Sequence, residues 1–466
     1  MSRMSKVGLE KGLYPKSIAI IGASTDPSKI GYRILKAVKS GGFKGEVYPV
    51  NIKGGKILGF KAFKTVLDIP GEVDLALISI PSTLVPGVVA ECGKKGVSLI
   101  VIFSAGFGEI RQGGKLEEKL VRTAEQFNVR IIGPNTNGIL NLNIKLNGTF
   151  SPILDYREGN IAFICQSGGY SSALLRYGTR EGVGFSKVIN VGNSCDIGFA
   201  DVLDFLADDE ATEVIVMYME GFKRTNEGRK FYEVAKRVTK IKPIIALKAG
   251  NTIAGKRAVR SHTGSLAGSD ELYRAAFRQS GVIRSSRGVE MMDISKALSL
   301  QPKLPRGNRV AILTNLGGPG VVAADVCEKN GLKLPAFSRD TQEYLSKTLS
   351  PTASFLNPVD LAADWPYLNV YGKVLESIIE DGNVDSVLIV AYISPDSEYQ
   401  VLLRDITNVY TTHNKPIIIC CLSAEEKTKA ICIKKLEKYL IPCYTMPEKA
   451  ATALAGMVEY SAYIKK

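Results

Sequence analysis

The stretch Ser17-Ile18-Ala19-Ile20-Ile21-Gly22-Ala23-Ser24-Thr25-Asp26-Pro27-Ser28-Lys29-Ile30-Gly31 decides the fold. A short apolar run stops at Gly22, and a segment that can form a helix follows it. The glycine lets the backbone turn sharply, so that free N–H groups at the helix start can hold a phosphate. This stretch predicts a buried strand, a ligand-binding turn and a helix.

Similar apolar runs recur as far as about residue 149, separated by amphipathic helical segments. The predicted strands of this part cover residues 17–21, 46–50, 74–80, 98–103 and 130–132. Such alternation is typical of a parallel sheet with right-handed crossovers and helices on both faces. Residues 1–150 are therefore predicted to form a Rossmann-like domain.

The alternation of apolar runs and helical segments then starts twice more. Predicted strands at 161–165, 187–190, 213–219 and 243–247 indicate a second domain over residues 151–302. A segment rich in turn formers and charge, residues 301–308, indicates a linker. Strands at 309–313, 386–392 and 416–421 indicate a third domain over residues 308–466. The predicted fold class is α/β, with three serial, doubly wound domains.

Composition places the chain among folded soluble proteins. It has 466 residues, of which 45% are hydrophobic and 23% charged, enough for about three domains of ~150 residues. The first apolar run is too short for a signal peptide, and no run is long enough to span a membrane. Eight cysteines are scattered without a Cys-x-x-Cys pair, which indicates reduced thiols, a cytoplasmic protein and no metal site.

The net charge of +14 raises the question of nucleic-acid binding. Lysines and arginines are spread along the predicted helices among acidic residues, and no basic run carries interleaved aromatics. We therefore expect no nucleic-acid partner. A polyphosphate ligand or an acidic partner subunit suits this charge better.

The sequence at the end of the second predicted strand limits which ligands this domain can bind. A dinucleotide site of the NAD type carries an acidic residue there and a Gly-x-Gly-x-x-Gly turn before it. This chain instead has Pro49-Val50-Asn51-Ile52-Lys53-Gly54-Gly55. Lys53 suits an additional phosphate, which leaves NADP and coenzyme A open; a Rossmann-like domain without a ligand is the third possibility.

His262 is one of only two histidines and lies in Arg260-Ser261-His262-Thr263-Gly264-Ser265-Leu266-Ala267-Gly268-Ser269. These small neighbours are typical of an exposed loop, in which a neutral imidazole can attack phosphorus. The leading hypothesis is a phosphohistidine, and the alternative is a hydrogen-bonded structural histidine. The preceding Gly250-Asn251-Thr252-Ile253-Ala254-Gly255-Lys256 is close to a P-loop, but Arg257 replaces the required hydroxyl residue. We interpret its glycines as giving freedom to a loop that carries His262.

Two glycine turns are predicted to begin helices directly after strands. They are Gln166-Ser167-Gly168-Gly169 and Asn315-Leu316-Gly317-Gly318-Pro319-Gly320. Two helix N-termini that converge on one phosphoryl group can stabilise it without a metal; tight packing of strand against helix is the alternative. Glu220 ends an apolar strand and can hold the Nδ1 proton of a histidine, or it can simply hydrate the strand end.

These motifs, together with Ile132-Gly133-Pro134-Asn135 and Asn357-Pro358-Val359-Asp360, resemble the α subunit of ADP-forming acetyl-CoA synthetases over essentially the whole chain. That family is similar to succinyl-CoA synthetase. The resemblance implies a CoA-binding Rossmann-like domain followed by two flavodoxin-like domains. It also implies a relay in which acyl-CoA and phosphate give acyl phosphate, His262 takes the phosphoryl group, and ADP receives it to form ATP.

The resemblance further implies site residues. Glu220 is expected to stabilise His262, and phosphate is expected at Ser167, Gly168, Gly317 and Gly318. The CoA site is expected at Gly22, Ala23, Ser24, Lys29, Lys53, Pro81 and Asn135. Gly169-Tyr170 and Gly318-Pro319-Gly320 depart from the usual family pattern, which leaves the preferred acyl group open. Asn357 and Asp360 receive no role.

ADP and Mg²⁺ are expected mainly on a partner chain, because the sequence carries no glycine-rich lysine segment of an ATP-grasp domain. The resemblance therefore implies a β subunit with that domain, in an α2β2 heterotetramer that performs substrate-level phosphorylation. Two other classes stay open: a non-catalytic CoA-binding or regulatory module, and an NADP-dependent oxidoreductase, against which the missing dinucleotide motif argues.

Overall fold

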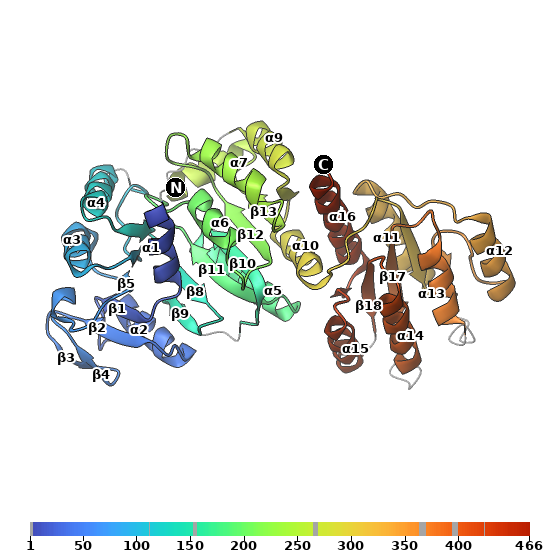
Figure 1. Cartoon of the computed structure of the whole chain (residues 1–466), viewed down its shortest axis with the longest axis horizontal. Coiled ribbons are helices and arrows are strands. Elements are labelled where there is room, and N and C mark those ends of the chain that lie inside the picture. The colour runs from blue at the N-terminus through green and yellow to red at the C-terminus, as the bar shows by residue number, and fades with distance from the viewer. Residues whose placement is uncertain are drawn as a thin grey trace. The chain divides into compact units, whose positions relative to one another are not determined.

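The computed structural model describes residues 3–110, 112–151, 156–263, 269–362, 370–393, 399–423 and 425–466 (Figure 1). For residues 3–7 and 260–263 it describes the backbone alone. The chain divides into two compact units, Met1–Gly288 and Val289–Lys466. Among the described residues, no helix combines the length and the apolar run that a bilayer crossing requires.

The first sheet of unit 1 is parallel and has the strand order β2-β1-β5-β6-β7. Its strands are β1 (Ser17–Ile21), β2 (Glu46–Val50), β5 (Leu75–Ile78), β6 (Leu99–Ile102) and β7 (Arg130–Ile132). All five strands predicted in this part are confirmed. A small hairpin of β3 (Gly55–Ile57) and β4 (Phe60–Ala62) was not predicted. Strand order reverses at β1, and the carboxyl edge beside such a reversal is where open α/β sheets bind ligands.

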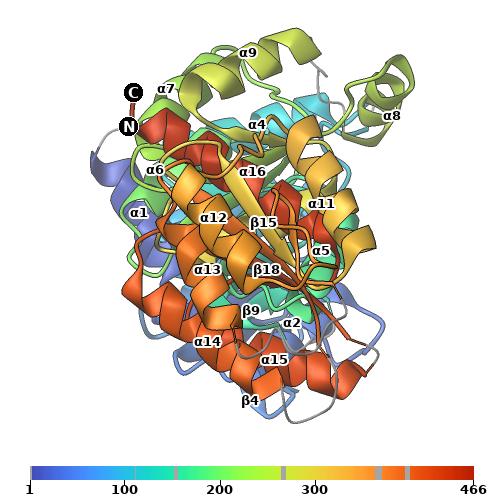
Figure 2. The same cartoon turned by 90° about the vertical axis from the view of Figure 1, so that its right-hand side faces the viewer.

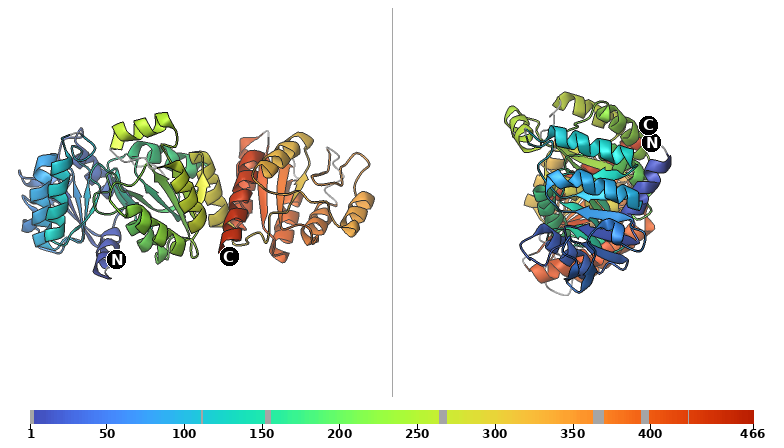
Figure 3. Two further views of the ribbon diagram at one scale, coloured as in Figure 1. Left: turned by 90° about the horizontal axis from the view of Figure 1, so that it is seen from above. Right: turned by 90° about the vertical axis from the view of Figure 1, so that its left-hand side faces the viewer.

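Helices cover both faces of the first sheet (Figure 3), and alternate residues of β1 belong to two different core clusters. Ile18 and Ile20 belong to the core cluster that contains residues of α1 and α2. Ala19 and Ile21 belong to the cluster that contains residues of α3 and α4. The helices are α1 (Arg3–Leu13), α2 (Ile30–Gly41), α3 (Val85–Lys95) and α4 (Gly114–Gln126), with short 3₁₀ turns at Val66–Asp68 and Ser82–Leu84. Burial on both faces explains the continuous apolar runs in the sequence.

The second sheet of unit 1 has the order β14-β13-β12-β10-β11-β8-β9. Its strands are β8 (Gly138–Asn141), β9 (Leu146–Thr149), β10 (Glu158–Cys165), β11 (Phe185–Asn190), β12 (Val214–Met219), β13 (Ile244–Lys248) and β14 (Ile283–Ser285). The four predicted strands are confirmed. β8 and β9 pair antiparallel at its edge, so residues 138–149 add to this sheet although they precede the predicted boundary at residue 150. Its helices are α5 (Gly168–Arg180), α6 (Phe199–Ala207), α7 (Glu227–Val238), α8 (Ile253–Thr263) and α9 (Asp270–Ser280).

Unit 2 contains a parallel sheet with the order β16-β15-β17-β18-β19. Its strands are β15 (Val310–Thr314), β16 (Val359–Asp360), β17 (Ser386–Tyr392), β18 (Ile417–Leu422) and β19 (Cys443–Tyr444), and the three predicted ones are confirmed. One helix layer holds α11 (Gly317–Lys329) and α16 (Pro447–Ile464), and the other holds α12 (Arg339–Thr348), α13 (Tyr371–Glu380), α14 (Tyr399–Thr412) and α15 (Glu426–Lys438) (Figure 2). α10 (Gly288–Leu300) leads into this unit. The α/β fold class is confirmed.

The segment before His262 differs from the prediction. Residues 253–263 form α8, not a flexible loop, and the backbone of His262 belongs to its last turn. The helix is favoured because Ala254, Ala258 and the basic residues between them are strong helix formers, and because Thr252 Oγ1 accepts a hydrogen bond from Gly255 N at 3.0 Å. Residues 264–268 of the predicted loop lie outside the described residues.

Candidate active site

The predicted CoA-site residues all lie at the carboxyl edge of the first sheet. Gly22, Ala23 and Ser24 follow β1, Lys53 follows β2, Pro81 follows β5, Asn135 follows β7, and Lys29 directly precedes α2. Parallel strands bring their carboxyl ends to one edge, which explains why residues so far apart in sequence share it. This is the arrangement that a ligand spanning the edge requires.

Gly22 has no substitute at the first of these turns. Its φ is +89°, and a Cβ there would stand 2.6 Å from the carbonyl oxygen of Ser79. Its N–H donates to Val50 O at 3.0 Å, which ties the turn to β2. The glycine thus permits both the turn and the close approach of the chain that follows β5.

Asn51 locks the turns after β1 and β2 together. Its side-chain amide donates to Ala23 O at 2.7 Å, and its Oδ1 accepts from Lys53 N at 2.9 Å. The amide of Asn51 therefore shapes the edge. Lys53 and Lys29 are exposed, and neither forms an ion pair with a described residue, so both are cations at this edge.

Asn135 links this edge to the second sheet. It adopts φ +55° after a cis Gly133–Pro134 bond, and its Nδ2 lies 3.4 Å from Oδ1 of Asn193. Asn193 in turn donates to Glu109 at 2.5 Å and to Glu117 at 2.9 Å. These hydrogen bonds hold the loop that follows β11 against the first sheet.

Glu220 directly follows β12 and is 4% exposed. The buried side chain of Gln166 holds the backbone around it: its Oε1 accepts from Glu220 N at 2.5 Å and from Gly221 N at 3.1 Å, and its Nε2 donates to Gly221 O at 2.9 Å. A buried carboxylate at a strand end, fixed by a neighbouring strand, is pre-organised to orient another side chain. The sequence pointed to Gln166 as part of a motif but not to this role.

Two tyrosines pack beside Glu220. The Tyr218 hydroxyl lies 3.4 Å from Glu220 Oε1, and its ring centre is 4.9 Å from that of Tyr170. Burial, and then the charge of Glu220, raises the pKa of Tyr218 above its ordinary value. Tyr218 therefore stays a neutral hydrogen-bond donor. Tyr170 is the residue at which the chain departs from the family pattern, so this departure lies beside Glu220.

Ser167 and Gly168 begin α5 at the same edge. Ser167 is the N-cap with extended φ and ψ, and its side chain makes no capping hydrogen bond. A Cβ on Gly168 would stand 2.8 Å from Asn137 Cβ, whereas Gly169 faces open space. The side chain of Ser167 therefore leaves the first N–H groups of α5 uncapped, and the phosphate site at Ser167 and Gly168 stays a prediction.

Lys248 is a buried lysine at this sheet edge that the sequence analysis did not single out. It ends β13 and pairs in register with Met219, so it lies on the strand beside the one that carries Glu220. It is 1% exposed, and its Nζ donates to Ala249 O at 2.5 Å and lies 4.7 Å from the Tyr273 ring centre. Burial lowers the pKa of Lys248 to about 8, although the charges of Asp270 and Glu220 oppose that change. A lysine directly after the strand predicted at residues 243–247 gave the only available signal.

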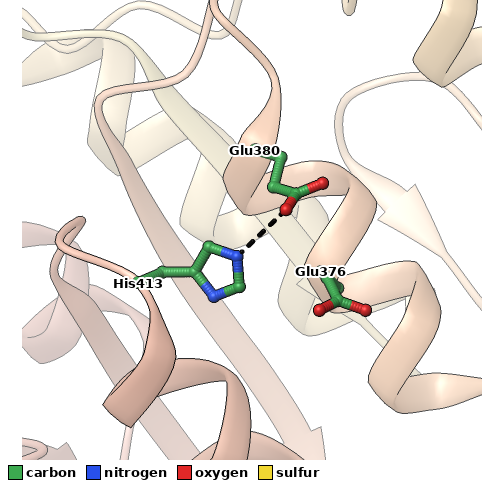
Figure 4. A group of neighbouring side chains, drawn as sticks. All are labelled: Glu376, Glu380 and His413. Atoms are coloured by element: carbon green, nitrogen blue, oxygen red, sulfur yellow. Dashed lines mark hydrogen bonds and ion pairs between the residues drawn. The ribbon is translucent and has the colours of Figure 1, made fainter.

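His262 itself is placed only by its backbone, at the end of α8. Its side chain lies outside the described residues, so its pairing with Glu220 stays a prediction. The second histidine, His413, has other contacts (Figure 4). Its Nδ1 lies 3.0 Å from Val409 O, and its Nε2 lies 3.2 Å from Glu380 Oε1. Within the described part of the chain, Glu376 joins these two in a group whose ligand atoms lie within 4.8 Å, on the surface of unit 2.

The second glycine turn belongs to unit 2. Leu316 is the N-cap of α11, and Gly317 and Gly318 are its first residues. Asn315 connects β15 to β17 by donating to Tyr392 O at 3.0 Å and accepting from Tyr392 N at 2.8 Å. A Cβ on Gly317 would stand 2.9 Å from a carboxylate oxygen of Asp360, so this acid lies beside the helix start.

Asn357, which received no role from the sequence, is structural. Its Oδ1 accepts from Ile312 N at 3.0 Å, and its Nδ2 donates to Val310 O at 2.8 Å and to Pro335 O at 3.1 Å. It therefore holds the chain before β16 against β15.

Three family models match the chain in sequence. A CoA binding domain matches residues 16–141, a succinyl-CoA ligase like flavodoxin domain matches residues 158–298, and a ligase-CoA domain matches residues 310–460. The chain is 44% identical to the acetate–CoA ligase [ADP-forming] II subunit alpha of Pyrococcus furiosus, over 96% of each chain. It is 42% identical to subunit alpha of the I form from the same organism, over 99% of each.

A solved structure agrees with these relatives. The dinucleotide-forming acetyl-coenzyme A synthetase 1 of Ca. Korarchaeum cryptofilum, in complex with phosphate and ADP, superimposes with a TM-score of 0.88. It is 38% identical, and the match covers 98% of this chain and 97% of that one. With this extent of identity in sequence and agreement in fold, the chain belongs to the family of ADP-forming acetate–CoA ligase α subunits, within the succinyl-CoA synthetase superfamily.

Proposed function

We propose that this chain is the α subunit of an ADP-forming acyl-CoA synthetase. The reaction converts acyl-CoA, ADP and phosphate into a carboxylic acid, ATP and CoA. The observation that carries the proposal is the 44% identity, over nearly the full length, to a subunit named acetate–CoA ligase [ADP-forming]. The buried carboxylate of Glu220 beside the start of α5 supplies the physical basis.

The first step uses the carboxyl edge of the first sheet. CoA binds across the turns that contain Gly22, Ala23, Ser24, Lys29, Lys53, Pro81 and Asn135. Lys53 is exposed and holds no carboxylate, so it is available to a CoA phosphate. Inorganic phosphate then attacks the thioester carbon; the C–S bond breaks, CoA leaves as the thiol, and an acyl phosphate remains.

The second step transfers the phosphoryl group to His262. The free imidazole nitrogen attacks phosphorus, and the bond from phosphorus to the acyl oxygen breaks to release the carboxylate. Glu220 accepts a hydrogen bond from Nδ1–H of His262 and so fixes the tautomer, a role that suits its burial and its fixation by Gln166. The helix starts at Ser167-Gly168 and at Gly317-Gly318 stabilise the phosphoryl charge before and after the transfer.

The third step passes the phosphoryl group to ADP on a partner chain. The two Pyrococcus relatives are named subunit alpha, which supports a β partner. Single-chain relatives support it as well: the match covers 62% of the acetate–CoA ligase [ADP-forming] of Methanocaldococcus jannaschii and 64% of form I from Archaeoglobus fulgidus. We assign ADP and Mg²⁺ to an ATP-grasp domain of that partner, in a cytoplasmic α2β2 assembly.

In the proposed function, each part of the chain has one task. Residues 1–150 bind CoA, residues 151–302 carry the phosphohistidine, and residues 308–466 form the ligase domain. The three family matches, at 16–141, 158–298 and 310–460, support these limits.

The test is phosphoryl labelling of the chain together with its partner. Acetyl-CoA and radiolabelled inorganic phosphate should give one acid-labile, alkali-stable phosphoryl group on this chain, and His262→Asn should abolish it. Label retained in His262→Asn would disprove the assignment. CoA binding without any phosphoryl exchange would favour a regulatory module, and tight NADP binding without competition by CoA would favour an oxidoreductase.

A further inference from the structure

Three fully buried lysines in this chain share one geometry. Lys187 and Lys248 are each 1% exposed and Lys296 is 3% exposed. Each ammonium lies over a tyrosine ring: Lys187 over Tyr14 at 4.7 Å, Lys248 over Tyr273 at 4.7 Å, and Lys296 over Tyr444 at 5.3 Å. Burying an ammonium costs free energy unless a negative charge compensates it.

Two of the three lysines have that negative charge. Lys187 Nζ lies 2.7 Å from Asp209 Oδ2, and Lys296 Nζ lies 2.6 Å from Glu437 Oε1. Asp209 also accepts from the Tyr14 hydroxyl at 2.5 Å, so lysine, acid and ring form one closed network. Both ion pairs are therefore structural.

Lys248 differs in its partners and in its place. No described carboxylate forms an ion pair with it, and its one described acceptor is the carbonyl of the next residue, Ala249. Lys187 belongs to the interior of β11, whereas Lys248 is the last residue of β13, at the carboxyl edge where Glu220 directly follows β12. A buried cation at the ligand edge is placed to act on a bound anion.

The proposed reaction requires a cation at this edge. In the proposed function, a phosphoryl group on His262 carries up to two negative charges, and the buried carboxylate of Glu220, its proposed partner, adds a third. The N-terminus of α5 supplies roughly half a positive charge. Without a further cation, Glu220 would repel the group that it is proposed to help form.

We propose that Lys248 is the positioning cation of the phosphohistidine site, which balances Glu220 and the incoming phosphoryl group so that His262 can be phosphorylated. This inference rests on the proposed function and extends it by a residue. Its chemistry is purely electrostatic: Lys248 forms no bond to phosphorus and transfers no proton.

The charge state of Lys248 gives the inference a measurable signature. Burial lowers the pKa of Lys248 to about 8, so its ammonium is present below that pH and is lost as the pH rises through it. The charged groups that act on it are Asp270 at the start of α9, Arg284 in β14, Glu220 after β12 and Lys256 in α8. Asp270 is held by Arg274 at 3.1 Å and by Arg284 at 2.5 Å. These arginines stay charged throughout the range, so the charge of Lys248 is the one that changes.

The experiment measures the rate of phosphoryl labelling of the chain with its partner, from acetyl-CoA and inorganic phosphate, between pH 6.5 and about 9.5. In the native chain the rate should fall as the pH rises through about 8. Lys248→Met should lower the rate roughly 100-fold at pH 7, the loss typical of removing one charge-stabilising group. Lys248→Arg should keep most of the rate and abolish the fall, because a guanidinium remains charged.

Lys187→Met is the matched control, because it removes an equally buried lysine from the same sheet. It should lower the Tm, since Asp209 is left buried without its cation, and should leave the pH profile of the folded fraction unchanged. A wild-type rate in Lys248→Met, or the same fall above pH 8 in Lys248→Arg, would overturn the role of Lys248. Absence of label in the native chain would overturn the proposed function itself, so the two failures are distinguishable.

Discussion

The starts of α5 and α11 are built on one plan but differ in charge. In each, an amide side chain precedes a glycine pair and fixes the end of a neighbouring strand: Gln166 holds Glu220 and Gly221, and Asn315 holds Tyr392. Beside α5 the nearest side chain to the first glycine is the neutral Asn137. Beside α11 it is the carboxylate of Asp360.

This difference indicates two different tasks. At α5 the side chain that lies nearest to the first glycine is neutral, so this side chain does not offset the partial positive charge of the helix start. A carboxylate beside a helix start offsets that charge and competes with an anion for the free N–H groups. We infer that α5 provides the stronger resting site for phosphate and that α11 holds a phosphoryl group only transiently. Substitutions at the starts of α5 and α11 should distinguish these two tasks.

The largest effect is expected from removing the amide before α5. Gln166→Ala leaves two backbone N–H groups and one carbonyl around Glu220 buried without their partner. The free energy of unfolding should fall by about 1–3 kcal/mol, and His262 labelling should be lost because Glu220 is no longer fixed. Chemical denaturation and phosphoryl labelling measure the two effects.

The matched variant is Asn315→Ala in unit 2. It removes two hydrogen bonds to Tyr392 and should lower the free energy of unfolding by less than Gln166→Ala does. Labelling of His262 from acyl phosphate should not be lost. Equal loss of labelling in both variants would show that the two amides do not differ in task.

Adding a methyl group to each helix start should give the next largest effect. In Gly168→Ala the new Cβ meets the stem of Asn137 at 2.8 Å, and a stem cannot rotate away. In Gly317→Ala the new Cβ meets a carboxylate oxygen of Asp360, at the end of a side chain that can rotate away. We expect Gly168→Ala to lower the free energy of unfolding by about 1–3 kcal/mol and to weaken phosphate binding. Gly317→Ala should lower the free energy of unfolding by less.

Gly169→Ala and Gly318→Ala are the controls for these variants, because both positions face open space. Each should leave stability unchanged or raise it by up to ~1 kcal/mol, since alanine favours a helix over glycine. A cost at Gly169 as large as that at Gly168 would contradict the packing argument.

Much of this arrangement could be predicted from the sequence. The continuous apolar runs at 17–21 and 386–392 identify strands because both faces of each sheet are buried. Within each parallel sheet, the residues that follow the strands could be placed at one carboxyl edge, because parallel strands end on the same side. The motif around Gln166 was equally visible, but its hydrogen bonds to Glu220 were not, because they join strands 54 residues apart.

Other features of the structure could not be predicted, because they leave no recognisable pattern in the sequence. β8 and β9 contain polar residues such as Asn141 and Asn147, which are buried only because they join the second sheet. The segment before His262 was interpreted as a loop because its two glycines outweighed the helix formers between them. Lys248 was overlooked because one lysine in an apolar run looks like a strand end; its burial and its missing carboxylate depend on tertiary packing.

The smallest expected effect tests the charge difference directly. Asp360→Asn removes the carboxylate beside α11, while its Oδ1 can still accept from Ala362 N at 3.0 Å, so the turn keeps its shape. Removing one partly exposed charge near a helix start is worth roughly 0.5–1 kcal/mol, so inorganic phosphate should bind there about two- to fivefold more tightly. Calorimetric titration of the native chain and of Asp360→Asn with phosphate measures the change, and Asp340→Asn, in the first turn of α12, is a control that should not move it. If phosphate affinity is the same in both chains, Asp360 does not distinguish the two helix starts, and the transient role of α11 must have another origin.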